Sequence, residues 1–244
     1  MIVAGIDFET TSVDPETCHP TEFALILWDS DTAEIVESTS FLLTVPETVP
    51  IDNSEITGIT RHMVDTAGYS WSKVEGRMLD RLNFADYLMA HNIAFDRTIL
   101  KRVINWKNYY GEKPFNDEHW IDTMTDVPYP PHIRTRSLPY LAAEHGFVNP
   151  FPHRALFDVA TMIKIAGLYD FDEILKYANS PNLWIRATVS FDDKQLAKDR
   201  HFRWDPTNKL WVKQVKEMNL DYEEEKADFP IDLLPGYEYK EAYA

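Results

Sequence analysis

Two carboxylates stand at the end of the first apolar segment of the chain, Ile2–Phe8. Asp7 and Glu9 are two residues apart. Side chains at that spacing point to the same face of an extended strand, whereas Phe8 points to the other face, into the core. Carboxylates held this close repel each other unless a cation joins them, and their hard oxygen atoms suit Mg²⁺ or Mn²⁺. Such a pair alone is more often an ordinary solvated strand end, so further residues must establish a metal site.

Two further acids follow histidines at short spacing. Asp96 closes the segment HNIAFD, residues 91–96. It falls in the expected first turn of a helix, where an aspartate also simply complements the helix dipole. Asp158 closes the segment HRALFD, residues 153–158. His153 and Asp158 are separated by about 140° around a helix. They can share a site only if His153 stands on the loop before the helix and Asp158 points from the helix itself.

The elements that would position these residues alternate between strands and helices. Apolar segments predict strands at Ile2–Phe8, Phe23–Trp28, Ile35–Val45, Tyr87–Ala90 and Trp120–Met124. Helical spacing and end signals predict helices at Trp71–Leu82, Ala94–Trp106, Leu138–His145 and Ala155–Ala166. Antiparallel strands followed by alternating strands and helices indicate a mixed α/β sheet flanked by helices. The composition changes after Pro181, so we expect a domain boundary near residue 180.

The motifs resemble a known family when they are taken in order. D-F-E-T-T, then H-N-x-x-F-D, then H-x-A-x-x-D is similar to the DEDDh (DnaQ-like) 3′–5′ exonuclease superfamily. That superfamily includes exonuclease X and the proofreading subunit of bacterial replicative polymerase. The resemblance covers about residues 1–170, including Ile56–Thr60 and Ile121–Thr123. It implies a ribonuclease H-like domain over residues 1–180. Thr11-Ser12 depart from the family's usual T-G, which affects the shape of that loop and not the metal ligands.

The resemblance also implies roles for particular residues. Four acids would hold two Mg²⁺ or Mn²⁺ ions: Asp7, Glu9, Asp96 and Asp158. His153 would be the general base, taking a proton from the attacking water. Thr10 and Ile59 match positions that line the pocket for the terminal nucleotide in the family.

The reaction implied is hydrolysis of phosphodiester bonds at the 3′ end of DNA. A two-metal mechanism would release nucleoside 5′-monophosphates, in repair, recombination or phage replication. Two alternatives stay open. One is an exoribonuclease of the same fold, since contacts to the 2′-hydroxyl cannot be identified in the sequence. The other is a non-catalytic acidic scaffold or DNA mimic, although such a protein has no need for four carboxylates and a histidine in this order.

The net charge is −16, and the charged residues are distributed unevenly along the chain. Residues 184–216 carry eight Lys or Arg against four acids, whereas residues 217–244 carry nine acids against two bases. Basic residues interleaved with tryptophans suit single-stranded nucleic acid. We therefore predict a small basic, Trp-rich α/β module at 184–217 and a solvated acidic tail at 218–244. The candidate binding residues of the module are Lys198, Arg203 and Trp204. Alternatively, its tryptophans form the core of a very small domain.

Targeting signals and cysteine usage favour a cytoplasmic protein, in the host cytoplasm if the chain is phage-encoded. The first residues lack a signal-peptide pattern, and no apolar run approaches the roughly 20 residues that span a bilayer. Cys18 is the only cysteine, which excludes an internal disulfide and fits a reducing cytosol. The sequence contains no P-loop pattern, so nucleotide hydrolysis is not indicated.

Overall fold

The computed structural model describes residues 1–104, 119–133 and 135–238. The chain divides into two compact units, Met1–Ala178 and Asn179–Ala244. The first unit contains the acidic motifs, and the second contains the basic, Trp-rich segment. Within the described ranges, no helix combines the length and apolar character needed to cross a bilayer.

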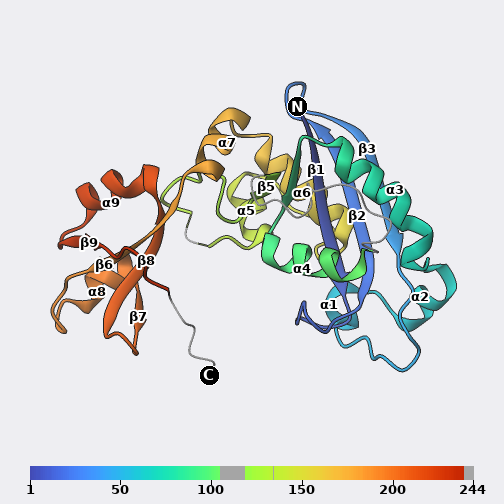
Figure 1. Cartoon of the computed structure of the whole chain (residues 1–244), viewed down its shortest axis with the longest axis horizontal. Coiled ribbons are helices and arrows are strands. Elements are labelled where there is room, and N and C mark those ends of the chain that lie inside the picture. The colour runs from blue at the N-terminus through green and yellow to red at the C-terminus, as the bar shows by residue number, and fades with distance from the viewer. Residues whose placement is uncertain (105–118, 134, 239–244) are drawn as a thin grey trace. The chain divides into compact units, whose positions relative to one another are not determined.

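The first unit is built on a mixed sheet. Its strands are β1 (Ile2–Thr10), β2 (Pro20–Asp29), β3 (Glu34–Leu42), β4 (Tyr87–Ala90) and β5 (Trp120–Asp122). They lie side by side in the order β3-β2-β1-β4-β5 (Figure 1). The first three are antiparallel neighbours, whereas β4 is parallel to β1 and β5 is parallel to β4. The predicted α/β fold with antiparallel strands first is therefore confirmed.

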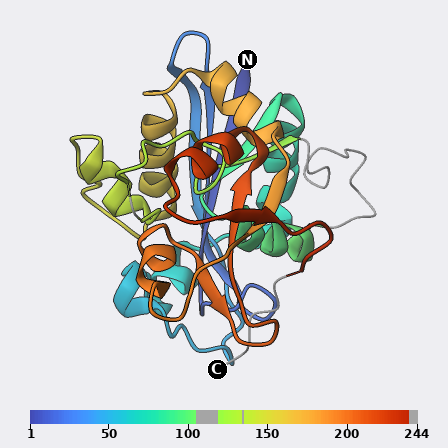
Figure 2. The ribbon, with the colours of Figure 1, turned by 90° about the vertical axis from the view of Figure 1, so that its left-hand side faces the viewer.

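Helices cover both faces of this sheet. The helices of this unit are α1 (Ser54–Thr57), α2 (Arg61–Ala67), α3 (Trp71–Phe84), α4 (Ile93–Val103), α5 (Leu138–Glu144), α6 (Ala155–Ala166) and α7 (Phe171–Asn179). Val3 and Ile26 point to one face and pack in a cluster with α5, α6 and α7. Ile6 and Leu25 point to the other face and pack in a cluster with α3 and α4. Figure 2 shows α6 on one side of the long strands β1 and β2, and α3 and α4 on the other.

A glycine brings helix α6 close to the central strand. A Cβ atom on Gly5 would lie 2.9 Å from Cγ1 of Val159 and 3.0 Å from Cδ1 of Ile163, closer than side chains normally approach. Gly5 precedes Asp7 by two residues on the same face of β1, and Val159 directly follows Asp158 on α6. This close packing therefore brings the two acids toward each other.

The structure differs from the sequence prediction in a few places. The predicted strand Ile35–Val45 is β3, which ends at Leu42, and the helix predicted to reach Trp106 is α4, which ends at Val103. Trp106 itself lies outside the described residues. The short helices α1 and α2 were not predicted. The hydroxyl of Thr60 caps α2 by accepting the N–H of Met63.

The second unit is a small antiparallel sheet with helices. Its elements are β6 (Asn182–Ala187), α8 (Lys194–Asp199), β7 (Arg203–Asp205), β8 (Leu210–Lys216), the 3-10 helix η4 (Glu217–Asn219), α9 (Leu220–Lys226) and β9 (Ile231–Leu233). The strand order is β7-β8-β6-β9. One face of the sheet contributes Ile185 and Val215 to a core that includes Ala197 of α8 and Leu220 of α9.

The prediction of a solvated acidic tail from residue 218 is wrong for the described residues. Strand β9 pairs with β6, and helix α9 packs on the core of the second unit. Glu223 of α9 is largely buried, and its carboxylate accepts hydrogen bonds from Arg200 at 2.7 Å and from Lys213 at 2.7 Å. Glu223, which the charge count assigned to the acidic tail, is therefore an ion-pair partner inside the second unit. Residues 239–244 lie outside the described part of the chain.

Candidate active site

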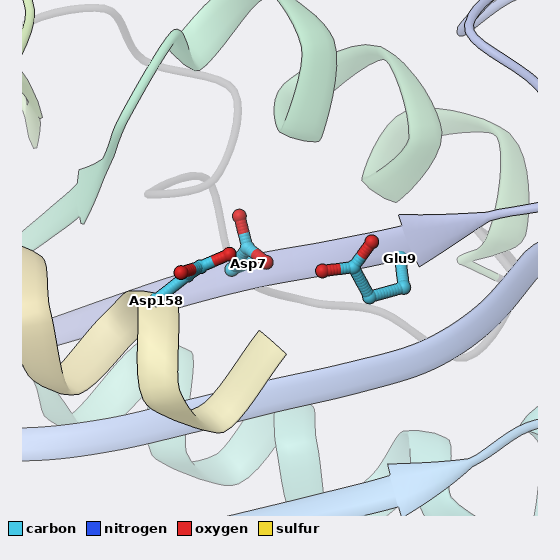
Figure 3. Close-up of side chains that lie close together, drawn as sticks. All are labelled: Asp7, Glu9 and Asp158. Carbon is cyan, nitrogen blue, oxygen red and sulfur yellow. The ribbon is translucent and has the colours of Figure 1, made fainter. Parts of the chain in front are cut away.

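Three carboxylates converge between strand β1 and helix α6. Asp7 and Glu9 project from β1 toward α6, and Asp158 projects from the first turn of α6 (Figure 3). One oxygen atom from each carboxylate lies within 4.8 Å of the others. Phe8 points to the opposite face, where its ring centroid lies 4.7 Å from that of Phe23. Strand alternation therefore places the pair as expected, and α6 supplies the third acid.

The electrostatics of this cluster require a compensating positive charge. Burial, followed by repulsion from Asp158 and Glu22, raises the pKa of Glu9 to about 8. Burial raises the pKa of Asp158 to about 6. Burial together with repulsion from Asp96 and Glu9 holds the pKa of Asp7 well above its usual range. Buried acids of this kind either retain protons or bind a cation. An all-oxygen ligand set of carboxylates fits a hard divalent cation such as Mg²⁺ or Mn²⁺.

The fourth predicted acid, Asp96, lies beside the trio of Asp7, Glu9 and Asp158. It is not among the carboxylates whose oxygen atoms lie within 4.8 Å of one another. Its carboxylate, on α4, is almost completely buried and accepts the backbone N–H of Phe8 at 3.0 Å. Strand β4 pairs with β1 only as far as Gly5, so Asp96 satisfies a backbone donor of β1 beyond the end of that ladder. Repulsion from Asp96 is the largest contribution, after burial, to the raised pKa of Asp7. The two carboxylates therefore share one electrostatic environment.

The turn that leads into α4 is held by Asp122 at the end of β5. Its two carboxylate oxygens accept the N–H groups of Asn92 at 3.0 Å and Ile93 at 3.1 Å, so an anion caps the positive end of the helix. His91 hydrogen-bonds to the hydroxyl of Thr123 at 2.9 Å and to the carbonyl of Arg136 at 2.7 Å. Burial lowers the pKa of His91, which favours its neutral form. These contacts fix the start of the helix that carries Asp96.

His153 stands on the loop before α6. Its backbone has a φ of 61°, an uncommon value for a residue other than glycine, and its N–H donates to Asp158 at 3.0 Å. The side chain of Asn149 donates to the other oxygen of Asp158 at 2.6 Å. His153, Asp158 and Asp7 line one pocket of about 310 Å³, together with His91 and Arg136. The structure thus has His153 on the loop and Asp158 on the helix.

The two residues proposed for the nucleotide pocket are buried. The side chain of Ile59 is fully buried, and the hydroxyl of Thr10 donates to the carbonyl of Ser12 at 2.6 Å. Neither is among the described residues that line the pocket beside His153. Their contact with a nucleotide therefore stays a prediction.

A buried ion pair next to the trio was missed by the sequence analysis. Glu22 of β2 lies opposite Glu9 of β1 in the sheet register. Its carboxylate accepts hydrogen bonds from Arg154 at 3.0 and 2.8 Å and from the N–H of Ala155 at 3.0 Å. The start of α6, between His153 and Asp158, is thereby attached to the sheet. The signal in the sequence was an acid directly before the apolar segment Phe23–Trp28.

Removing the arginine of this pair should destabilise the protein. Arg154→Ala leaves the buried charge of Glu22 without its partner, beside Glu9. Because the guanidinium is partly exposed, we expect a loss of about 1–3 kcal/mol in the free energy of unfolding, below the range for fully buried pairs. Chemical denaturation measures this.

The exposed Arg77–Glu37 pair supplies the matched control. Arg77→Ala should change the free energy of unfolding by no more than about 1 kcal/mol. Adding Glu22→Gln to Arg154→Ala should restore part of the lost stability, because the unpaired charge is then removed. Equal losses for Arg154→Ala and Arg77→Ala would contradict the stabilising role of the Glu22–Arg154 pair.

A mixed sheet flanked by helices, with carboxylates converging from its central strand and an adjacent helix, defines an α/β domain of the ribonuclease H-like class. Residues 4–166 match the family described as Exonuclease (RNase_T), and the chain therefore belongs to this exonuclease family. The resemblance to DEDDh exonucleases is thereby confirmed. Residues 183–234 match a second family, described as a domain of unknown function (DUF8626). A comparison with curated proteins finds no match.

Solved structures share the fold at low sequence identity. One is an exonuclease I structure with a TM-score of 0.63 and 16% identity, covering 88% of this chain and 62% of that one. Another is E. coli exonuclease I with a dT13 oligonucleotide, with a TM-score of 0.63, 15% identity and coverages of 88% and 63%. The nuclease domain of 3′hExo, a DEDDh family member bound to rAMP, has a TM-score of 0.55 and 19% identity, covering 68% and 90%. The chain thus spans about 62% of the exonuclease I chain.

Proposed function

We propose that the chain is a metal-dependent exonuclease that hydrolyses phosphodiester bonds at the 3′ end of DNA and releases nucleoside 5′-monophosphates. The observation that carries this proposal is the convergence of Asp7, Glu9 and Asp158 beside a pocket that His153 also lines. Membership of the exonuclease family supports the reaction class. The likeness to exonuclease I bound to a dT13 oligonucleotide favours DNA as the substrate.

Two divalent cations would be held by Asp7, Glu9 and Asp158, with Asp96 as the further acid beside Asp7. When bound, they would supply positive charge to the attacking and leaving oxygens of an in-line displacement at phosphorus. His153 would accept the proton of the attacking water, as a general base within reach of the pocket. The N–H of His153 and the side-chain amide of Asn149 hold the Asp158 carboxylate in place. Asp122 and Glu22 fix the starts of the two helices that carry Asp96 and Asp158.

Digestion of 5′-labelled single- and double-stranded DNA and RNA tests this function. With Mg²⁺ or Mn²⁺ we expect a ladder that shortens from the 3′ end of DNA, and with EDTA no cleavage. Preferential shortening of RNA would replace DNA by RNA as the substrate, as the likeness to 3′hExo bound to rAMP also allows. Absence of cleavage on every substrate by the folded protein would contradict the proposed activity.

The metal-free protein should lose stability as the pH rises. Glu9 and Asp158 have folded-state pKa values of about 8 and about 6, above those of unfolded carboxyl groups. The folded chain therefore binds more protons than the unfolded chain between about pH 5 and pH 8, and the free energy of unfolding falls through this window. A divalent cation must displace these protons, so its stabilising effect should grow over the same window.

Thermal unfolding at several pH values, in EDTA and in Mg²⁺, measures both effects. Glu9→Gln removes the group with the higher of these two pKa values and should flatten the pH dependence in EDTA. A Tm in EDTA that rises toward pH 8, or Mg²⁺ stabilisation that is independent of pH, would contradict the assignment of these acids as the cation site.

A further inference from the structure

The sheet of the second unit has two chemically different faces. One face carries Ile185 and Val215 and packs on the core with α8 and α9. Strand alternation places Trp184, Val212 and Gln214 on the opposite face. In the register of the sheet, Trp184 lies opposite Gln214, and Arg203 of β7 lies opposite Val212. These side chains therefore form a contiguous patch that the apolar core of the unit does not use.

This patch is hollowed into a pocket of about 330 Å³. Gln214 and Val212 of the central strand β8 lie between Trp184 on one side and Arg203 on the other. His201 lines the pocket together with Arg203, which it precedes by two residues. Arg203 and His201 are both exposed. The pocket therefore has an aromatic wall, a cationic wall and an amide between them.

We propose that this pocket binds one nucleotide of a single-stranded nucleic acid. The base packs against Trp184, the side-chain amide of Gln214 hydrogen-bonds to the base edge, and the phosphate lies against Arg203 and His201. Aromatic rings next to cations are the two components by which proteins bind single strands without reading their sequence. This inference rests on the proposed function, because the ligand is the strand that the first unit shortens.

Asp205 and Asp232, on the same face, have hydrogen-bond partners of their own. The hydroxyl of Tyr237 and the side chain of Asn208 donate to Asp205, and these bonds lower its pKa to about 2, so this carboxylate stays ionised. The ring centroid of Tyr237 also lies 5.4 Å from that of Trp184, which supports the tryptophan from one side. Asp232 pairs with Arg186 at 3.0 Å. Within the described part of the chain neither of these two carboxylates pairs with Arg203, whose side chain is exposed and can bind an anion.

The other predicted binding residues lie on the core-facing side of the sheet. Trp204 lies opposite Trp211 on β8, with their ring centroids 5.5 Å apart, and the ammonium of Lys198 lies 5.9 Å from the Trp211 ring. Lys213 also lines the pocket, but its ammonium is paired with Glu223 at 2.7 Å. The sequence grouped Lys198, Arg203 and Trp204 as one surface, but only Arg203 belongs to the pocket. Neighbouring residues of a strand point to opposite faces, which explains the separation.

Binding of long and short fluorescent oligothymidylates to the full chain tests the pocket. The variants are made in an Asp7→Asn background to prevent digestion. Arg203→Glu should weaken binding of the long oligomer by about tenfold or more at low salt and reduce the salt dependence. Trp184→Ala should weaken it by about 5- to 100-fold through lost stacking. Lys194→Glu, an equal charge change on α8 of the same unit, is the matched control and should have a much smaller effect.

The outcomes separate this inference from the proposed function. Cleavage by the wild-type chain is measured in parallel, and its absence on every substrate would overturn both. If the wild type cleaves but Arg203→Glu binds the long oligomer as tightly as Lys194→Glu does, the pocket is not the binding site. A loss of binding on Lys198→Glu and none on Arg203→Glu would place the strand on the opposite face. Thermal unfolding of Arg203→Glu should be unchanged, which shows that its loss of binding does not come from a loss of fold. Arg203→Glu therefore tests the pocket even if Trp184→Ala is unstable.

Discussion

Asp7→Asn is expected to lower the rate of cleavage by about 10³-fold or more while leaving the protein folded. Asp7 lies within the acidic cluster, where burial, followed by repulsion from Asp96, Glu9 and Asp158, raises its pKa. Charge stabilisation by bound cations contributes several kcal/mol, and each 1.4 kcal/mol corresponds to about a factor of ten in rate. An amide retains the shape of the side chain and loses the negative charge that holds the cations.

The same substitution should raise the thermal stability of the metal-free protein. Removing a buried carboxylate relieves repulsion among the remaining acids, so the Tm in EDTA should increase and the additional stabilisation by Mg²⁺ should shrink. Asp80→Asn, at an exposed position of α3, is the matched control and should change neither quantity. Near-normal cleavage by Asp7→Asn, or a Tm in EDTA below that of the wild type, would contradict the role assigned to Asp7.

The elements with strong local patterns could be predicted from the sequence. Strand β4 (Tyr87–Ala90) and helix α6 (Ala155–Ala166) have the predicted bounds, because an apolar segment or a helical repeat is a property of neighbouring residues. Helices α1 and α2 have only four and seven residues. Four residues are too few for a recognisable helical repeat, and α2 depends on the cap formed by Thr60.

The candidate site combines features that follow from local sequence with contacts between distant parts of the chain, and only the first kind could be predicted from spacing. The shared face of Asp7 and Glu9 follows from strand alternation alone. The approach of Asp158 depends on Gly5, which allows α6 to pack closely on β1. No spacing in the sequence indicates that contact, and only the order of the motifs in the family pointed to it.

Ion pairs between distant residues could not be read from the sequence. Glu22 and Arg154 are separated by 132 positions, and the charge of each alone indicates no partner. The same reason explains the error about the acidic tail. Glu223 was counted with its acidic neighbours, whereas in the fold it neutralises Arg200 and Lys213. Counting charges along the chain therefore underestimated how far the second unit extends.

His153→Asn is expected to lower turnover by about 10²- to 10⁴-fold, the usual effect of losing a general base. Asparagine tolerates the left-handed backbone that His153 adopts, with its φ of 61°, better than alanine does. The substitution also retains the N–H that donates to Asp158. It therefore removes the imidazole without disturbing the position of the acid, and affinity for Mg²⁺ should be unchanged.

The pH dependence of turnover distinguishes a base from a merely structural histidine. A histidine base works in its neutral form, so turnover of the wild type at saturating Mg²⁺ should fall as the pH is lowered below neutrality. The variant should lose this decline together with most of its rate. His132→Asn, at an exposed histidine, should keep both the rate and the profile. If His153→Asn is slow but its pH profile keeps the shape of the wild type, His153 positions the loop, and another group accepts the proton.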